Sequence, residues 1–189
     1  ERPISFTLVV DDLGVKYTSK QDADHLFGVL EAKYPLKVDW SGSKYIGIDL
    51  EWHYDARVPY VVLSMKGYVQ KALREYLWQK RRDTFGPTPF TTHEYGKKVQ
   101  YVTEDNSPRL DPKGIKEIQR VAGKFLYNGR AVDTTILHGL NKLNRAATKA
   151  TGETKIAIDL LKDYLATNPD AQIIFRASDM RLEIDADAA

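Results

Sequence analysis

Two adjacent carboxylates, Asp11 and Asp12, are the residues of this chain that are best suited to chemistry. They follow an apolar run, 6–10, and precede a Leu13-Gly14 turn and a second β-prone run. This pattern predicts a β-hairpin that holds both acids at its tip. Neighbouring carboxylates repel each other, and a divalent cation relieves the repulsion while it binds phosphate oxygens. The pair therefore predicts Mg²⁺ or Mn²⁺ binding for two-metal phosphoryl transfer. The alternative is a polar turn without chemistry.

Four further segments follow the acidic pair in an informative order. They are Tyr45-Ile46-Gly47-Ile48, Leu63-Ser64-Met65-Lys66-Gly67-Tyr68-Val69, Pro87-Thr88-Pro89 and Ala122-Gly123-Lys124-Phe125-Leu126-Tyr127. With Val9-Val10-Asp11-Asp12 they resemble, in family order, the reverse transcriptase of copia-type LTR-retrotransposon polyproteins. The matching family segments are the Tyr-x-Asp-Asp hairpin, the primer-gripping hairpin, the helix opened by Leu-Ser-Gln, the Pro-Thr-Pro linker and the Val-Gly-Ser-Leu-Leu-Tyr helix. Val9 departs from the family, in which most members carry Tyr.

The resemblance implies a fragment of an RNA-directed DNA polymerase, from the end of the palm through the thumb and connection to the start of RNase H. It implies Asp11 as the direct metal ligand and Asp12 as the weaker one, with the third carboxylate upstream of this chain. The intact enzyme would join a dNTP to a primer 3′-hydroxyl with two Mg²⁺. The partners implied are a template–primer duplex of RNA or DNA and the rest of the polyprotein, in cytoplasmic virus-like particles and the nucleus. The fragment alone is expected to be inactive.

The last residues, 181–189, resemble the opening strand of RNase H, which ends in a catalytic Asp followed by small residues. Asp187 is the expected acid, and Asp185 is the alternative. A polar chain end is the reading without chemistry. The other RNase H acids are absent from the chain, so hydrolysis of RNA by this mechanism is not expected of it.

Basic residues gather between positions 66 and 82, where six Lys and Arg stand against the single acid Glu75. Lys71 and Arg74 are three residues apart and share one helical face, and Lys66 precedes the helix. We expect these three to contact phosphates of a nucleic acid, with a merely solvated face as the alternative. Lys37 aligns with a family Lys near the incoming nucleotide, and a solvent-facing strand Lys is its alternative.

Composition excludes several other classes of protein. There is no Cys, so a disulfide framework, a thiolate zinc site and a Cys nucleophile are excluded. The four His lack an i, i+4 partner, and no Gly-rich nucleotide fingerprint or Gly-x-Ser-x-Gly is present. No apolar run approaches the roughly 20 residues that span a bilayer. The net charge of +2 does not by itself indicate a nucleic-acid partner.

Periodicity predicts an α+β fold, with the hairpin, a helix and a small antiparallel sheet of a polymerase palm before a mainly helical region. Strands are expected over 36–40, 46–52, 60–63, 172–176 and 181–185. Helices are expected after Ser19, over 69–77, and in three stripes between 115 and 165. The expected division is palm 1–77, linker-like stretch 78–112, thumb and connection 113–170, and RNase H start 171–189.

Two other functions remain open from the sequence. The first is a non-catalytic nucleic-acid-binding or interaction module from a decayed or domesticated element. Its support is the absence of Tyr at position 9. The second is an unrelated metal-dependent phosphohydrolase that uses Asp11 and Asp12, although no partner acid stands at a useful spacing.

Overall fold

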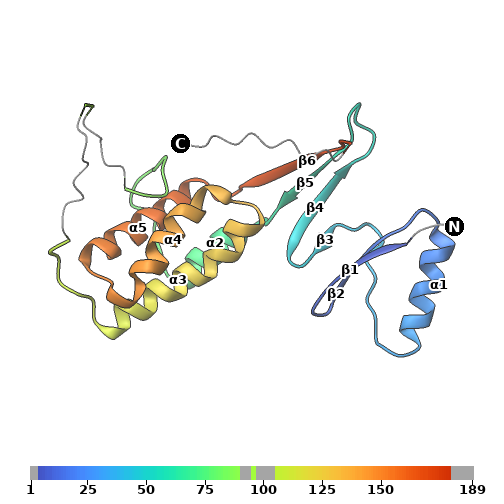
Figure 1. Cartoon of the computed structure of the whole chain (residues 1–189), viewed down its shortest axis with the longest axis horizontal. Coiled ribbons are helices and arrows are strands. Elements are labelled where there is room, and N and C mark those ends of the chain that lie inside the picture. The colour runs from blue at the N-terminus through green and yellow to red at the C-terminus, as the bar shows by residue number, and fades with distance from the viewer. Residues whose placement is uncertain (1–3, 90–94, 97–104, 180–189) are drawn as a thin grey trace. The chain divides into compact units, whose positions relative to one another are not determined.

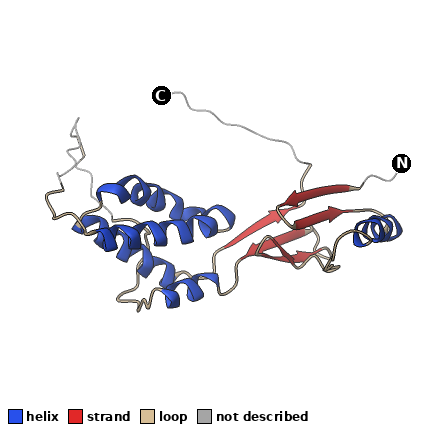
Figure 2. Ribbon diagram, turned by 90° about the horizontal axis from the view of Figure 1, so that it is seen from below, coloured by secondary structure: helices blue, strands red, loops and turns tan. Residues whose placement is uncertain are grey.

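The computed structural model describes residues 4–89, 95–96 and 105–179. Contacts divide the chain into two compact units, one of residues 1–63 with 174–189 and one of residues 64–173. Among the described residues there are five α-helices and two small β-sheets (Figure 1; Figure 2). This mixture of elements confirms the predicted α+β class.

The first unit holds the strands and one helix. A two-stranded antiparallel hairpin pairs β1 (Ser5–Val9) with β2 (Asp12–Lys16), and helix α1 (Lys20–Glu31) follows it. The second sheet has the order β3-β4-β5-β6. Its strands are β3 (Lys44–Tyr45), β4 (Ile48–His53), β5 (Tyr60–Ser64) and β6 (Gln172–Arg176). Position 181 and those after it, where a further strand was expected, lie outside the described residues.

The strand expected over 36–40 is wrong: these residues form an exposed loop. Trp40 turns toward α1, where its ring meets the edges of Tyr17 and Phe27 and lies 4.0 Å from the Lys20 Nζ. Side-chain packing thus outweighs the alternation of apolar and polar residues. The strand expected over 46–52 is also interrupted, because Ile46 and Gly47 form a turn with φ of 46° and 80° between β3 and β4.

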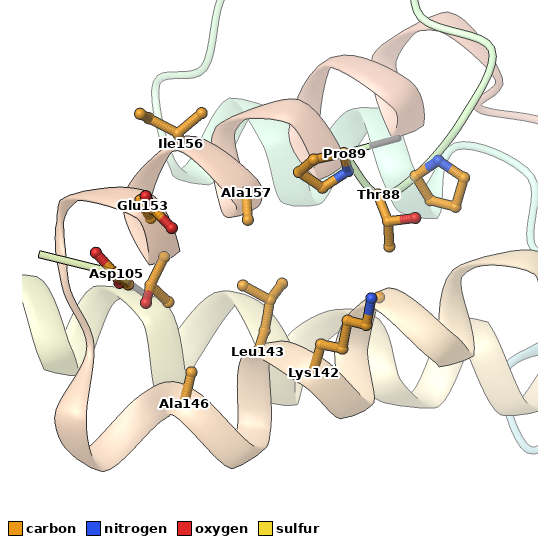
Figure 3. Close-up of a pocket in the computed structure, with 12 residues that line it drawn as sticks. Thr88, Pro89, Asp105, Lys142, Leu143, Ala146, Glu153, Ile156 and Ala157 are labelled. Atoms are coloured by element: carbon orange, nitrogen blue, oxygen red, sulfur yellow. The ribbon is translucent and has the colours of Figure 1, made fainter. Parts of the chain in front are cut away.

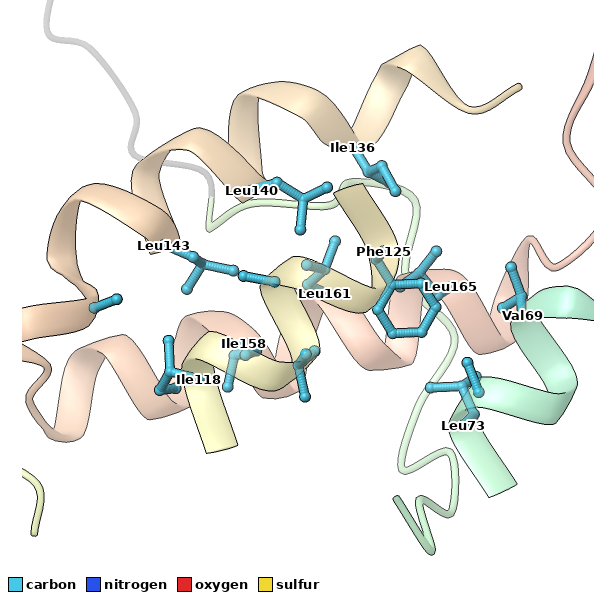
Figure 4. Packing of buried hydrophobic residues seen from close by; sticks show 14 of the residues in the cluster. Val69, Leu73, Ile118, Phe125, Ile136, Leu140, Leu143, Ile158, Leu161 and Leu165 are labelled. Atoms are coloured by element: carbon cyan, nitrogen blue, oxygen red, sulfur yellow. The ribbon is translucent and has the colours of Figure 1, made fainter. Parts of the chain in front are cut away.

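The second unit is helical. Its helices are α2 (Tyr68–Glu75), α3 (Pro112–Ala131), α4 (Leu137–Ala146) and α5 (Gly152–Thr167), with single 3-10 turns at Thr134–Ile136 and Ala147–Lys149. Asp111 and Thr151 cap α3 and α5 by accepting hydrogen bonds from backbone N–H groups three residues on. The predicted apolar stripes meet in one core around Phe125 (Figure 4). Each buried Leu, Ile or Phe there contributes roughly 2 kcal/mol to folding.

The described residues of 78–111 form no helix or strand, as expected, and α3 begins at Pro112, the last residue of the expected stretch. Its first part is nevertheless fixed to α5. The Trp78 indole N–H and the Arg81 backbone N–H both donate to the Asp163 carboxylate, at 3.2 and 3.0 Å. The compact units divide between Leu63 and Ser64, and α2 and this stretch lie in the same unit as the later helices.

Leu77 ends α2 in a left-handed conformation, with φ of 51°, and its side chain is 90% exposed. A left-handed residue with a Cβ costs about 1–2 kcal/mol, and a Leu that is exposed recovers little of it. We expect Leu77→Gly to raise the free energy of unfolding by about 0.5–1 kcal/mol after the entropy cost of glycine. Urea unfolding measures this. Val58→Gly, also exposed but with ordinary φ, should give no gain; equal gains would remove the explanation.

Asp39 organises the loop before β3. Its carboxylate accepts hydrogen bonds from the hydroxyl and backbone N–H groups of Ser41 and Ser43, which lower the pKa of Asp39 to about 2. A lowered pKa stabilises the folded state above the unfolded value of 3.8, and the gain is lost as pH falls toward 2. NMR titration should show the low pKa rising in Ser41→Ala with Ser43→Ala. Ser5→Ala should leave it unchanged, and a wild-type value near 3.8 would contradict the geometry.

Candidate functional site

The acidic pair lies at the tip of the β1–β2 hairpin, as predicted, but the turn is not at Leu13-Gly14. Val9 pairs with Asp12, so the two-residue turn is Val10-Asp11, and Leu13 and Gly14 lie within β2. The turn thus lies three residues earlier than the predicted Leu13-Gly14 turn, and its first residue, Val10, adopts a positive φ of 56°. Such a conformation is strained for a β-branched residue and favours glycine at this turn position. Both carboxylates are exposed.

Asp11 and Asp12 present two carboxylates and no more. Within the described residues no group of three or more His, Cys, Asp or Glu side chains is placed to hold a metal ion. Mg²⁺ keeps several waters and binds through one or two carboxylates when phosphates supply the remaining oxygens. The exposed pair fits that partial role, and the chemistry it supports depends on ligands from a phosphate-bearing partner.

Two other residues were predicted to be functional, and the structure describes only one of them, Lys37. Lys37 lies in the exposed loop 36–40 rather than on a strand, so the spacing that aligned it with a nucleotide-binding Lys does not reflect strand register. Asp187, like its alternative Asp185, lies outside the described residues. Neither residue can be added to the acidic pair from the geometry.

The basic residues predicted on α2 occupy one exposed face. Lys71 and Arg74 are exposed, while Val69, Ala72 and Leu73 are buried in the core. This is the division of faces expected from their spacing. Lys66 is exposed in the turn before the helix. Of the remaining predicted cluster, Lys80 pairs with Asp83 and Arg81 with Asp159, which removes two cations from the free surface.

Helix α3 continues this face beside α2. The Lys124 ammonium donates to the Glu75 carboxylate at 2.9 Å, and that hydrogen bond lowers the pKa of Glu75. Tyr76 donates its hydroxyl proton to the Arg120 carbonyl, and the Arg120 guanidinium lies 5.5 Å from the Tyr76 ring centroid. Lys71 on α2 and Arg120 and Lys124 on α3 therefore lie near Glu75, and the positive charges of all three lower its pKa.

The exposed cations of α3 and α4 were not predicted from the sequence as candidate phosphate-binding residues. Those on α3 are Lys113, Lys116, Arg120 and Arg130; those on and after α4 are Lys142, Arg145 and Lys149. All seven are exposed and make no ion pair among the described residues. The signal available was the i, i+3, i+7 spacing of 113, 116 and 120, and again of 142, 145 and 149. This spacing of the cations is hard to recognise in the sequence because apolar core residues stand between them.

The acids of the same unit are mostly engaged within it. Lys162 is 2% exposed and pairs with Asp159 at 2.9 Å and Glu117 at 3.4 Å. Burial raises the pKa of Asp159, but hydrogen bonds from Lys162 and Lys155 outweigh it and the pKa is lowered. Both carboxylates therefore stay charged and neutralise interior cations. The cations on the outer faces of α2, α3 and α4 are left without that compensation.

A cleft of about 440 Å³ lies between α4, α5 and the Pro87-Thr88-Pro89 segment (Figure 3). Leu143 and Ala157 line it, with Lys142 toward one end and Asp105 toward the other. The Asp105 carboxylate already accepts hydrogen bonds from the Ser107 hydroxyl and the Thr151 hydroxyl. No set of free polar groups converges on the cleft from the described residues, so it offers no catalytic arrangement.

Metal binding by the hairpin should be weak, because two exposed carboxylates supply too few ligands. We expect a dissociation constant for Mg²⁺ on the order of 1 mM or higher by calorimetry. Asp11→Asn with Asp12→Asn should abolish the heat. Asp22→Asn with Asp55→Asn, which removes the same charge elsewhere in the unit, should leave it. Tight stoichiometric binding would show that the site is complete without further ligands.

None of the helices in the part of the chain that the structure describes is both long and apolar enough to cross a membrane. No protein-family model, curated protein or solved structure matches the chain.

Proposed function

We propose that this chain is part of an RNA-directed DNA polymerase of a retrotransposon polyprotein. Its helical unit, residues 64–173, holds the template–primer duplex. Its hairpin acids, Asp11 and Asp12, contribute to a two-metal site for nucleotidyl transfer. The ordered resemblance of the motifs supports the assignment, and the cationic surface of α2, α3 and α4 supports the contact with nucleic acid.

The division of charge between the two units is the observation that carries the proposal. Residues 64–173 hold 19 Lys and Arg against 12 Asp and Glu, a net charge of +7. The rest of the chain holds 9 against 14, a net charge of −5, and together they give the +2 of the whole. A near-neutral chain thus concentrates positive charge in one unit. Such a surface attracts a phosphate backbone irrespective of base sequence.

The role of each group follows from its chemistry. Exposed Lys and Arg bind phosphates and position a duplex without reading its bases. Asp11 and Asp12 would hold Mg²⁺ with help from phosphate oxygens and from a further carboxylate, which the described residues do not bring to the pair. When bound, the two ions would activate the primer hydroxyl and stabilise the leaving pyrophosphate. Of these roles, only phosphate binding by the exposed Lys and Arg is assigned to this chain alone.

A non-catalytic nucleic-acid-binding module is the second candidate. The observation in its favour is that the described residues bring no third carboxylate to Asp11 and Asp12. Both candidates require the cationic surface, and they differ in the need for metal. Addition of the missing palm strands to this chain would give metal-dependent primer extension only under the first.

Nucleic-acid binding by the chain should be sequence-independent and steeply dependent on salt. Lys71→Ala with Arg74→Ala should weaken binding to an RNA–DNA hybrid equally across sequences. It should also flatten the slope of log K against log salt by about 1 for each lost phosphate contact. Fluorescence anisotropy between low and physiological salt measures both quantities.

Lys16→Ala with Lys33→Ala is the matched control. It removes two exposed cations from the acidic unit and should leave the affinity and the slope nearly unchanged. Equal losses in the two double variants would show that net charge alone drives binding. Unchanged binding in the Lys71, Arg74 variant would show that the α2 cations are merely solvated.

A further inference from the structure

Tyr45 contacts the acidic hairpin from outside it. The Tyr45 hydroxyl lies 2.9 Å from the Thr7 Oγ1 on β1, a hydrogen-bonding distance. The same ring covers Gly14 on β2, since a Cβ built on Gly14 would lie 3.3 Å from the ring and 2.9 Å from the Thr7 Oγ1. The absence of a side chain at Gly14 is therefore what lets the ring reach Thr7.

The strand register identifies the face that Tyr45 covers. Thr7 pairs with Gly14, and Val9 pairs with Asp12. Residues two apart on a strand, and residues paired across it, point to the same side of a sheet. Tyr45 therefore lies on the face that carries Asp12, two residue pairs below the Val9–Asp12 pair at the tip. Phe6 and Leu8 lie on the other face, and their side chains are 66% and 64% exposed.

The position of Tyr45 is itself fixed by its own hairpin. Ile46 and Gly47 both adopt positive φ in a two-residue turn, the geometry of type I′ loops. Tyr45 is the last residue of β3 before that turn and pairs with Ile48. An isolated two-stranded hairpin is marginally stable in water, so an outside contact matters to the order of β1 and β2.

We infer that Tyr45 is a positioning residue for the acidic hairpin, which holds the face that carries Asp12 through its hydroxyl contact with Thr7 and its packing on Gly14. The inference rests on the proposed metal role of Asp11 and Asp12. Tyr45 touches neither metal nor nucleic acid in this role. It acts by limiting the motion of the β1–β2 hairpin, whose tip carries both carboxylates.

The test is Mn²⁺ titration of the chain followed by NMR line broadening at the Asp11 and Asp12 amides. Tyr45→Phe keeps the ring and removes the hydroxyl. We expect the apparent affinity for Mn²⁺ at these amides to fall about three- to tenfold, the loss that one hydrogen bond accounts for. Amide exchange at Val9 and Asp12, measured without metal, should accelerate in the same variant. Tyr54→Phe, which removes an exposed hydroxyl of the same unit, should change neither.

Thr7→Val completes a double-mutant cycle. If the two hydroxyls act through each other, the double variant should lose no more than either single variant. Additive losses, or an unchanged Mn²⁺ affinity in Tyr45→Phe, would overturn the inference while the metal site stands. No broadening at the wild-type hairpin would overturn the metal role, and the positioning role with it. Faster exchange with unchanged Mn²⁺ affinity would reduce Tyr45 to a stabilising contact and overturn its role in metal binding.

Discussion

The helical unit depends on the carboxylates of α5. The Asp163 carboxylate accepts hydrogen bonds from the Trp78 indole N–H and the Arg81 backbone N–H. The Asp159 carboxylate accepts one from the Arg81 guanidinium at 3.0 Å. Two cations lie over the Trp78 ring, with the Lys162 Nζ 3.9 Å and the Arg81 guanidinium carbon 4.5 Å from its centroid. A stretch without secondary structure is thereby held against a helix. Removal of the Asp159 carboxylate would leave the buried Lys162 with only the more distant Glu117 as an ion-pair partner, which is a destabilising change.

This arrangement has a consequence for the surface. Acids consumed by interior and helix-capping contacts cannot neutralise the outward cations of α2, α3 and α4. The acids Glu75 on α2 and Glu117 on α3 are both held in ion pairs, Glu75 by Lys124 and Glu117 by Lys155 and Lys162. The stability of the unit and the charge of its surface are thus linked. The carboxylates that form ion pairs inside the unit are not available to neutralise the cations on its outer faces. The proposed binding to a polyanion would need only that imbalance of charge and no dedicated pocket.

The acidic hairpin illustrates a different constraint. Its tip is a two-residue turn in which Val10 takes a positive φ, and its strands expose much of their apolar surface. Such an element holds its shape only with support from neighbours. Gly14 is needed where Tyr45 approaches, so a residue that looked like a turn former in sequence serves close packing within a strand. The proposed metal role of Asp11 and Asp12 would depend on that packing as well as on their adjacency.

The sequence alone determined the α+β class, the hairpin that carries Asp11 and Asp12, and the apolar stripes that form the helical core. These follow from local rules: alternation over strands, a 3.6-residue period over helices, and the cost of crowding two carboxylates. The same rules placed Lys71 and Arg74 on one exposed face of α2. Local periodicity sufficed wherever neighbours in sequence were also neighbours in space.

Tertiary structure decided the rest. Alternation at 36–40 predicted a strand, but Trp40 packs on Tyr17 and Phe27 and draws the segment into a loop. The stretch after α2 read as a linker, yet Asp163, more than eighty positions away, binds it. The cations of α3 and α4 are left without ion pairs among the described residues because nearby acids such as Glu117 and Asp159 pair with Lys155 and Lys162. Each of these outcomes depends on contacts between residues far apart in sequence, whose partners no local pattern specifies.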